Sequence, residues 1–276
     1  MSPKEIHATL LPEVREQVLL LAAGYPIEQL GQELENFSAY FQGLAIAHLL
    51  RSADVEQFKL YLTRSGYARR YFLSRSALEG NTEDPRLALA RTESFFDVLA
   101  ANQIDLASDI ARLSGHIWRS DWEYEDDFCY FLFLHQLIGQ NRSAGIVGGA
   151  NILDRFESAL QGGSSYRLNI CRSLLGRDRE AFQNALSGLL AQRRDEMRNL
   201  RERMQQVEPT SCVIWARSFV CIEGYALLRV AELLGLYPID HNEELPLCPQ
   251  LGRIEDGPSA FEDIFEGIDR ERTRVQ

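Results

Sequence analysis

Long hydrophobic runs are missing from this sequence of 276 residues. Its longest apolar stretches fall well short of the roughly 20 residues that a helix needs to cross a bilayer, so we expect no membrane-spanning segment. The N-terminus carries acidic residues before any apolar stretch and shows no small-residue cleavage site. We therefore expect no secretory signal and a cytoplasmic protein. Hydrophobic residues still make up 45% of the chain, which is enough for a large buried core.

The common signatures of catalysis and of metal binding are also missing. The five cysteines are scattered without a CxxC pair, which indicates reduced core thiols, and the five histidines show neither HxxxH nor HExxH spacing. There is no GxSxG elbow, and the glycine-rich segment 139–150 lacks both lysine and the GxxxxGK[ST] pattern of a phosphate-binding loop. We therefore expect no catalytic residues, no metal site and no cofactor. The glycine-rich segment is interpreted as a flexible connection.

Lysine is nearly absent, because Lys4 and Lys59 are the only two in the chain. The formal net charge is −11. Such an excess of acids does not suit a protein that binds nucleic acid, since that affinity comes largely from neutralising phosphates. It suits a protein whose partner is basic.

Helical periodicity dominates the sequence, and no segment alternates in the way that a strand does. The predicted fold class is all-α, with antiparallel helical hairpins stacked as a degenerate repeat-like array. An Asp followed by Phe at +4 and Leu at +8 occurs in both Asp54–Leu62 and Asp178–Leu186, which favours such an array. The chain divides into an N-terminal half, 1–140, and a C-terminal half with an acidic tail, 150–276. We expect the two halves to form one continuous domain.

A central helix is predicted at Ser120–Leu137, which reads SDWEYEDDFCYFLFLHQL. Ser120 and Glu123 fit a capping box, in which the serine hydroxyl accepts a backbone N–H and the glutamate reaches back to the serine. The acids that follow load the first two turns with negative charge, which the helix dipole favours. The second half, Phe128–Leu134, is apolar on every side, as is typical of a buried helix.

The acidic front of this helix carries more charge than the dipole needs, because Glu123 and Asp127 are spaced to lie side by side on one face. Three interpretations stay open: a solvated helix start, a negative patch for a positive partner, and a carboxylate metal site. The metal site would use Glu123, Asp126 and Asp127 with His116 or His135, but the ExxH motif of di-iron bundles does not occur. The residues alone favour binding over catalysis.

Among the further helices that are expected are those at Pro85–Ala101, Asp178–Met204 and Cys212–Gly235. Glu223 lies among apolar residues of the last one, where a shielded carboxylate needs a hydrogen bond or an arginine. Neither Arg217 nor Arg229 shares its face. The tail, Tyr237–Asp269, holds nine acids and one arginine and is an alternative contact surface. It is expected to end in a short helix that docks through residues such as Phe265.

Three stretches together resemble a known family. They are 95–114 (FFDVLAANQIDLASDIARLS) with 122–134 (WEYEDDFCYFLFL), 176–190 (GRDREAFQNALSGLL), and 219–236 (FVCIEGYALLRVAELLGL) with the acidic loop and the LP that follow. They are similar to the helical immunity proteins of bacterial polymorphic toxin systems, specifically immunity family forty-nine. The resemblance spans roughly residues 85–250, and the first 80 residues match no motif of the family.

The resemblance implies a cytoplasmic antidote that is not an enzyme. Such a protein binds a cognate toxin, which neighbouring cells deliver, for example by type VI secretion, or which the same cell makes, and it occludes the toxin's active site. Many such toxins have basic clefts that an acidic face could occupy, with Trp122 and Tyr124 as aromatic anchors. The toxin-binding residues carried over by position are Trp122, Glu123, Glu125, Asp126, Asp127 and Glu223.

Two other classes of function stay open on the sequence. One is a helical-repeat scaffold or regulatory module that binds a different protein. The other is a carboxylate-metal-dependent hydrolase that uses the acids of the central helix.

Overall fold

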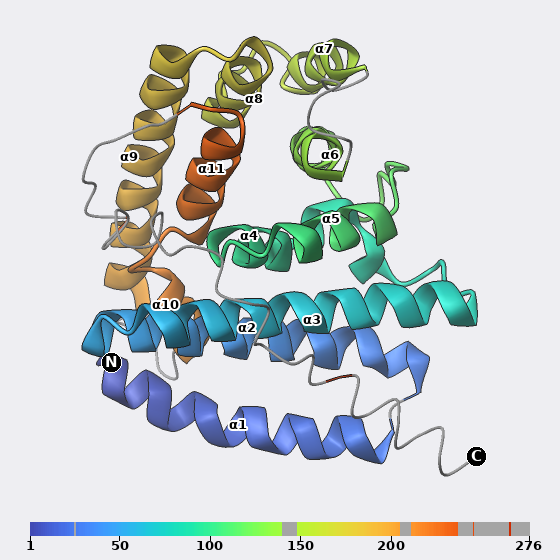
Figure 1. Cartoon of the computed structure of the whole chain (residues 1–276), viewed down its shortest axis with the longest axis vertical. Coiled ribbons are helices and arrows are strands. Elements are labelled where there is room, and N and C mark those ends of the chain that lie inside the picture. The colour runs from blue at the N-terminus through green and yellow to red at the C-terminus, as the bar shows by residue number, and fades with distance from the viewer. Residues whose placement is uncertain (25, 140–147, 205–210, 237–244, 246–264, 266–276) are drawn as a thin grey trace.

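The computed structural model describes all residues except 25, 140–147, 205–210, 237–244, 246–264 and 266–276. Within this part of the chain every regular element is a helix and none is a strand, so the all-α prediction is confirmed. The helices stack in successive layers, from α1 at one end to α7 and α8 at the other, and α9 runs across the layers along one side (Figure 1). No helix of the described residues combines the length and the apolar character needed to span a membrane.

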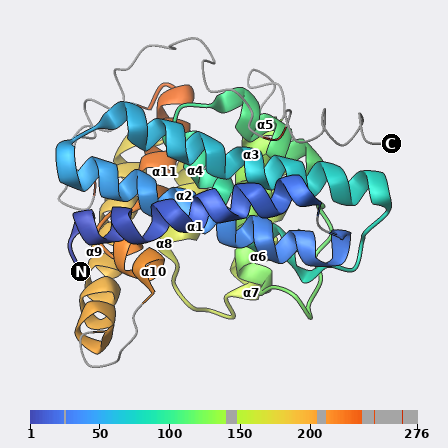
Figure 2. The same cartoon turned by 90° about the horizontal axis from the view of Figure 1, so that it is seen from below.

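Three long helices form the first layer and lie side by side in antiparallel order (Figure 2). They are α1 (Pro3–Ala23), α2 (Ile27–Ser52) and α3 (Val55–Glu79). Ser2 starts α1 with a capping box, in which its Oγ accepts from the Glu5 N–H and its own N–H donates to the Glu5 carboxylate. Gly24 ends the helix at a φ of 94°, which a glycine adopts without steric cost.

The second layer packs on α3 and contains short elements followed by the central helix. These elements are η1 (Pro85–Leu87), η2 (Leu89–Arg91), α4 (Glu93–Ala100), α5 (Ile104–Leu113) and α6 (Glu125–Gly139). The prediction of one helix at Pro85–Ala101 was therefore wrong. The Arg69 guanidinium binds the carbonyl oxygens of Arg86 and Ala88, and the Glu123 carboxylate accepts the Ala90 N–H at 2.7 Å. Because side chains satisfy these backbone groups, the segment does not need continuous helical hydrogen bonds.

The central helix α6 begins at Glu125, so the predicted start at Ser120 was wrong. The capping box of Ser120 with Glu123 does not form, because residues 120–123 make a turn in which the Trp122 N–H bonds to the Arg119 carbonyl at 2.9 Å. The apolar second half, Phe128–Leu134, is buried throughout, which confirms that part of the prediction.

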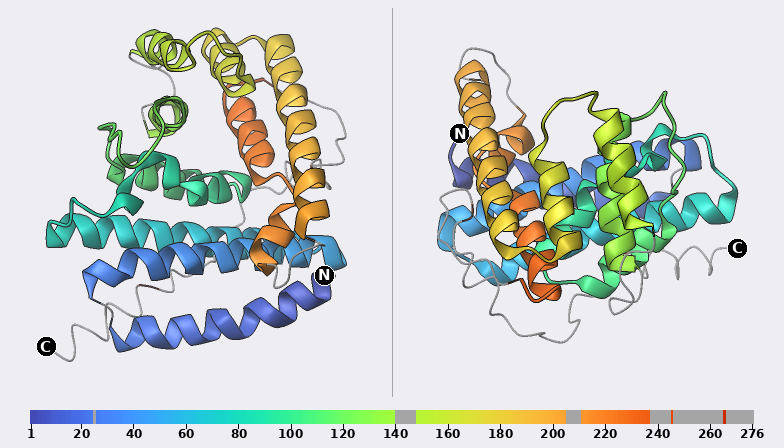
Figure 3. Two further views of the ribbon diagram at one scale, coloured as in Figure 1. Left: turned by 180° about the vertical axis from the view of Figure 1, so that it is seen from behind. Right: turned by 90° about the horizontal axis from the view of Figure 1, so that it is seen from above.

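Of the remaining helices, α8, α9 and α11 cluster beside one another above the second layer, whereas α10 lies beside α2 in the first layer (Figures 1 and 3). The remaining helices are α7 (Gly149–Ala159), α8 (Tyr166–Gly176), α9 (Arg179–Met204), α10 (Cys212–Arg217) and α11 (Ile222–Leu233). The long helix predicted at Asp178–Met204 is confirmed as α9. The helix α11 packs on α4, and α10 packs on α2, so elements from both ends of the sequence share one core.

The helix predicted at Cys212–Gly235 is broken into α10 and α11, which corrects the sequence interpretation. Two arginines of α9 bind the carbonyls that the break leaves without helical partners. Arg193 donates to the Arg217 carbonyl at 2.6 Å, and Arg201 donates to the Ser218 carbonyl. Cys221 then starts α11, since its Sγ accepts the Gly224 N–H at 3.3 Å.

The repeated Asp–Phe–Leu pattern marks two equivalent hairpin junctions. Asp54 and Asp178 each accept the N–H three residues on, at 3.0 Å, at the start of α3 and α9. Each follows a residue in the left-handed region, Ala53 at φ 52° and Arg177 at φ 53°. The Phe and Leu of both segments are buried, namely Phe58, Leu62, Phe182 and Leu186. The stacking of similar hairpins is therefore visible in the structure.

The acidic tail falls almost entirely outside the described residues, as do residues 140–147 of the flexible connection predicted at 139–150, whose ends lie in α6 and α7. Phe265 is described: it is 1% exposed, and its ring stacks on Tyr71 with centroids 4.8 Å apart. Its predicted docking role is confirmed at this one position.

Candidate functional site

Three of the six predicted binding residues lie in one cavity. Asp126 and Asp127 lie in the first turn of α6, and Glu223 lies in the first turn of α11. All three line a cavity of about 350 Å³ between α6, α7, α8, α9 and α11, as does Glu196 of α9. We call this cavity, with its four carboxylates, the acidic groove.

Arg167, in the first turn of α8, joins the walls of the acidic groove. Its Nε and Nη2 donate to the two carboxylate oxygens of Glu223 at 2.9 and 3.0 Å, and its Nη1 donates to Asp127 Oδ1 at 3.0 Å. Tyr130 Oη donates to the same Glu223 carboxylate at 2.8 Å. A guanidinium matches a carboxylate as a two-pronged fork. One cation therefore fixes α6, α8 and α11 relative to one another.

The protonation states in this network follow from burial and from charge. Burial raises the pKa of Asp127, and Arg167 acts against that shift. Burial and then the charge of Glu223 hold the pKa of Tyr130 well above its usual value. Burial acts to lower the pKa of Arg167, but the Glu223 carboxylate outweighs it and holds that pKa above the usual value. The four carboxylates of the groove face only two guanidiniums, Arg167 and Arg193, so the groove has an excess of negative charge.

Asp126 and Glu196 are the acids of the groove that no guanidinium binds in the described part of the chain. Asp126 makes no hydrogen bond or ion pair with another described residue, and Glu196 accepts one hydrogen bond, from Gln192 Nε2 at 2.8 Å. Tyr166 adds a half-exposed aromatic wall beside them. Its ring lies directly over Gly188, where an added Cβ would come within 2.1 Å of the ring. The glycine therefore permits the close approach that shapes this wall.

The other three predicted residues point elsewhere. Glu123 is half-buried, and burial raises its pKa while its carboxylate binds the Ala90 N–H. The expectation that it neighbours Asp127 on one helical face was wrong, because Glu123 precedes α6. Glu125 pairs with Arg155 of α7 at 2.7 Å. Trp122 lies against the Arg119 guanidinium, which is 4.1 Å from the ring centre.

The loop between α5 and α6 exposes large side chains next to these residues. Tyr124 is 79% exposed and Ile117 is 78% exposed. Apolar side chains that are this accessible on a loop are available as contacts for another protein.

The acids considered for a metal site do not converge. The Glu123 carboxylate accepts a hydrogen bond from the Ala90 N–H, and the Asp127 carboxylate accepts one from Arg167. His135 is 1% exposed and lies beside the ring of Phe95, with ring centroids 4.2 Å apart. In the chain as described, no group of three His, Cys, Asp or Glu side chains is placed to hold a metal ion.

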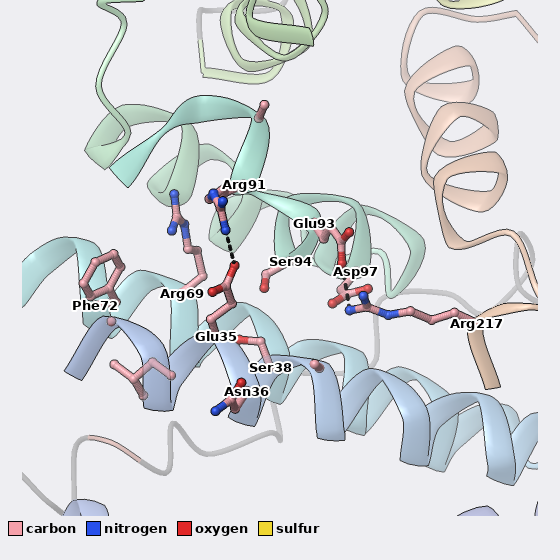
Figure 4. Close-up of a pocket in the computed structure, with 14 residues that line it drawn as sticks. Glu35, Asn36, Ser38, Arg69, Phe72, Arg91, Glu93, Ser94, Asp97 and Arg217 are labelled. Carbon is pink, nitrogen blue, oxygen red and sulfur yellow. Dashed lines mark hydrogen bonds and ion pairs between the residues drawn. The ribbon is translucent and has the colours of Figure 1, made fainter. Parts of the chain in front are cut away.

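Two further cavities adjoin the acidic groove. A middle cavity of about 430 Å³ shares four lining residues with the groove, namely Asp127, Arg167, Arg193 and Glu223. A third cavity of about 320 Å³, the Asp97 cavity, shares three lining residues with the middle cavity, namely Ala90, Glu93 and Arg217. Figure 4 shows the Asp97 cavity, with Asp97 beside the ion pair of Glu93 and Arg217.

Asp97 of α4 is a buried carboxylate, 1% exposed. Its Oδ1 accepts from Gln42 Nε2 and its Oδ2 accepts from Ser65 Oγ, both at 2.5 Å. These donors are neutral and do not fully offset the cost of burying a negative charge. Burial therefore raises the pKa of Asp97 to about 7.

Replacing Asp97 with asparagine is expected to flatten the pH dependence of stability. The folded-state pKa of about 7 lies above the value of about 4 for an unfolded aspartate. The folded state therefore binds the extra proton, and wild-type stability falls as pH rises through this window. The free energy of unfolding can be measured with urea from about pH 5 to about pH 8. That of Asp97→Asn should rise relative to that of the wild type as pH increases. Equal pH slopes for the two proteins would contradict this account.

Sequence reasoning missed Arg167 as the partner of Glu223. It searched the helix of Glu223, whereas the partner comes from α8, 56 residues away. The signal that was available is the shielded carboxylate itself, which requires a cation from a neighbouring element.

The family model described as immunity protein 49 matches residues 38–250. This match covers well over half of the chain. The chain belongs to the immunity protein 49 family. The family resemblance inferred from sequence motifs is thereby confirmed, and the match extends it towards the N-terminus, from about residue 85 to residue 38. No curated protein and no solved structure matches the chain.

Membership in the immunity protein 49 family indicates a protein that protects against a toxin. The family suggests a role other than catalysis. The matched region contains the whole acidic groove, the middle cavity and most of the Asp97 cavity.

Proposed function

We propose that this chain binds a cognate bacterial toxin in the cytoplasm through its acidic groove and blocks the toxin's active site. The observation that carries the proposal is the groove itself, in a chain of this family. Asp126 and Glu196 are carboxylates of the groove that no described guanidinium binds, and Asp127 and Glu223 are held in place by Arg167.

Charge complementarity is the main physical support for a basic partner surface. The chain has a formal net charge of −11, and the groove carries four acids against two arginines. A basic cleft would be attracted to such a surface before contact, which speeds association at low salt. The rigid Arg167 network lowers the entropic cost of binding, because the groove walls are already fixed.

Aromatic and apolar side chains supply the contacts that charge alone does not. Tyr166 lies in the groove wall, while Tyr124, Trp122 and Ile117 lie on the loop before α6. Tyrosine and tryptophan are enriched among the residues that dominate interface energies. We further propose that the two halves of the chain act as one binding unit, since α11 packs on α4 and α10 packs on α2.

Reversing the accessible charges should weaken the complex while leaving the fold intact. Asp126→Arg combined with Glu196→Arg alters neither Arg167 nor its partners. We expect the Kd for the purified toxin encoded beside this gene to rise at least about tenfold, which is about 1.4 kcal/mol. Most of the change should appear in the association rate, and it should shrink at high salt. Calorimetry gives the affinity and stoichiometry, and stopped-flow kinetics gives the rates.

Asp195→Arg combined with Glu202→Arg is the matched control. Both residues are exposed on α9, neither lines the groove, and the change in net charge is the same. The control should bind within about twofold of the wild type. Equal losses in the two variants would show that net charge, and not the groove, governs binding. No complex with the wild-type chain would contradict the proposed function.

A further inference from the structure

The acidic groove, the middle cavity and the Asp97 cavity follow one another along the molecule. Each neighbouring pair shares lining residues, and we call the three adjoining cavities the trough, which extends from the cavity walled by α7 and α8 to the one walled by α2 and α3. Two sets of ion pairs divide the trough. Arg167 with Glu223 stands between the groove and the middle cavity, and Arg217 with Glu93, 2.7 Å apart, stands between the middle cavity and the Asp97 cavity.

The middle cavity has a different character from the groove. Large apolar side chains from α4, α6, α9 and α10 line it, together with one from the segment between α10 and α11: Phe96, Phe131, Met197, Leu200, Ile214 and Val220. Its charged groups are already engaged, since Arg167 binds Glu223 and Asp127, Arg217 binds Glu93, and Arg193 donates to the carbonyls of Arg217 and Val220. An apolar side chain would therefore be favoured in this compartment, because it removes apolar surface from water and leaves the ion pairs intact.

The Asp97 cavity ends the trough with a buried carboxylate. Its three arginines are engaged: Arg217 with Glu93, Arg91 with Glu35 at 3.5 Å, and Arg69 with the carbonyl oxygens of Arg86 and Ala88 (Figure 4). Asp97, in contrast, has no cation within ion-pair distance among the described residues. A cationic side chain that entered this cavity would supply the missing opposite charge.

We propose that the trough binds one extended segment of the toxin, with a basic side chain in the acidic groove, an apolar side chain in the middle cavity and a second basic side chain beside Asp97. This inference rests on the proposed function and specifies the part of the toxin that is recognised. An extended chain suits three adjoining cavities of about 350, 430 and 320 Å³, because its side chains can enter successive cavities while its backbone stays outside the partitions. A helix would have to displace the ion pairs that divide the trough.

Blocking the Asp97 cavity tests the inference separately from the acidic groove. Ala39 lines this cavity and is only partly buried, so Ala39→Trp fills the cavity from its rim. We expect the Kd for the purified toxin to rise at least tenfold. Ala191→Trp makes the same change at an exposed position of α9 that lines none of the three cavities. It should leave the Kd within about twofold of the wild type.

Photo-cross-linking supplies a second measurement, which reports the position of the toxin segment and does not depend on the stability of Ala39→Trp. The photoreactive residue p-benzoylphenylalanine is placed at position 91, where the side chain lines the Asp97 cavity and is 49% exposed, in one protein and at position 192, in the wall of the acidic groove, in another. Mass spectrometry of the cross-linked toxin should place both sites on one stretch of about ten residues that contains two basic side chains around an apolar one.

The outcomes separate the inference from the proposed function. If the wild-type chain binds the toxin and Ala39→Trp binds it equally well, the trough proposal is wrong but the immunity function stands. The same holds if the cross-links fall on distant parts of the toxin. Cross-links from both positions to one helix of the toxin would overturn the extended conformation. Failure of the wild-type chain to bind the toxin would overturn both.

Discussion

Arg167→Met is expected to lower the free energy of unfolding by about 2 kcal/mol. The substitution removes the cation that pairs with Glu223 and Asp127 and leaves both carboxylates near the protein interior. Exposed ion pairs contribute about 0.2–1 kcal/mol, whereas breaking a buried pair costs about 3–5 kcal/mol. The Arg167 side chain is 34% exposed and that of Glu223 is 15% exposed, so the pair lies between these limits.

A double-mutant cycle separates the lost ion pair from lost packing. Glu223→Gln removes the negative charge that Arg167→Met leaves uncompensated. The double variant should therefore be more stable than the sum of the single effects predicts, by about 1 kcal/mol. Arg172→Met is the control on the same helix, because Arg172 pairs with Glu157 at a site where both side chains are well exposed. It should cost less than about 0.5 kcal/mol. Strict additivity in the cycle would contradict the role given to Arg167.

Gly66→Ala is expected to destabilise the fold by about 2 kcal/mol. Gly66 lies inside α3, and an added Cβ would come within 1.9 Å of Val98 Cγ1 and 3.1 Å of Leu106 Cδ2. In a helix interior, alanine stabilises the helix by about 1 kcal/mol more than glycine does. Overpacking a close contact costs about 1–3 kcal/mol and occasionally more. At 1.9 Å the clash should exceed the gain in helix propensity, because α4 and α5 would have to move away from α3.

Gly176→Ala is the matched control for this prediction. Gly176 ends α8, and an added Cβ there meets nothing within 4 Å. The free energy of unfolding of Gly176→Ala should equal that of the wild type or be slightly higher. Combining Gly66→Ala with Val98→Ala should recover part of the loss, since the alanine then occupies the space of the missing methyl groups. Thermal unfolding of all four proteins measures these differences. A Gly66→Ala variant more stable than the wild type would show that α3 does not need this close approach.

Local patterns predicted the helices well where one physical rule dominated. The apolar run Phe128–Leu134 is buried because no face of it can meet water favourably. The Asp–Phe–Leu pattern of Asp54–Leu62 and of Asp178–Leu186 marked two helix starts, where the structure adds that the Asp caps the helix and that the Phe and Leu are buried. These features depend on residues within two helical turns, so the sequence alone defines them.

Predictions failed where distant side chains satisfy the backbone. The capping box of Ser120 does not form because Glu123 binds Ala90, 33 residues earlier. The apolar run at Cys212–Gly235 is not one helix because Arg193 and Arg201 of α9 bind the carbonyls of the break. Local propensity cannot report such contacts, since they exist only after the helices have packed.

The candidate site shows the same division between local and distant information. Asp126 and Asp127 could be selected from their crowding at one helix start, and Glu223 from its apolar surroundings. Arg167, Glu196 and the two adjoining cavities could not be selected, because their relation to those acids depends on how α8 and α9 pack against α6 and α11.

The most direct test of the central claim is protection of bacteria that express the cognate toxin, for which the product of the adjacent gene is the first candidate to test. Growth is followed with the wild-type chain, with Asp126→Arg combined with Glu196→Arg, and with the exposed α9 control, at matched expression. The wild-type chain and the control should restore growth, and the groove variant should protect poorly. Death of cells that contain the wild-type chain would contradict a neutralising function, and full protection by the groove variant would contradict binding through the acidic groove.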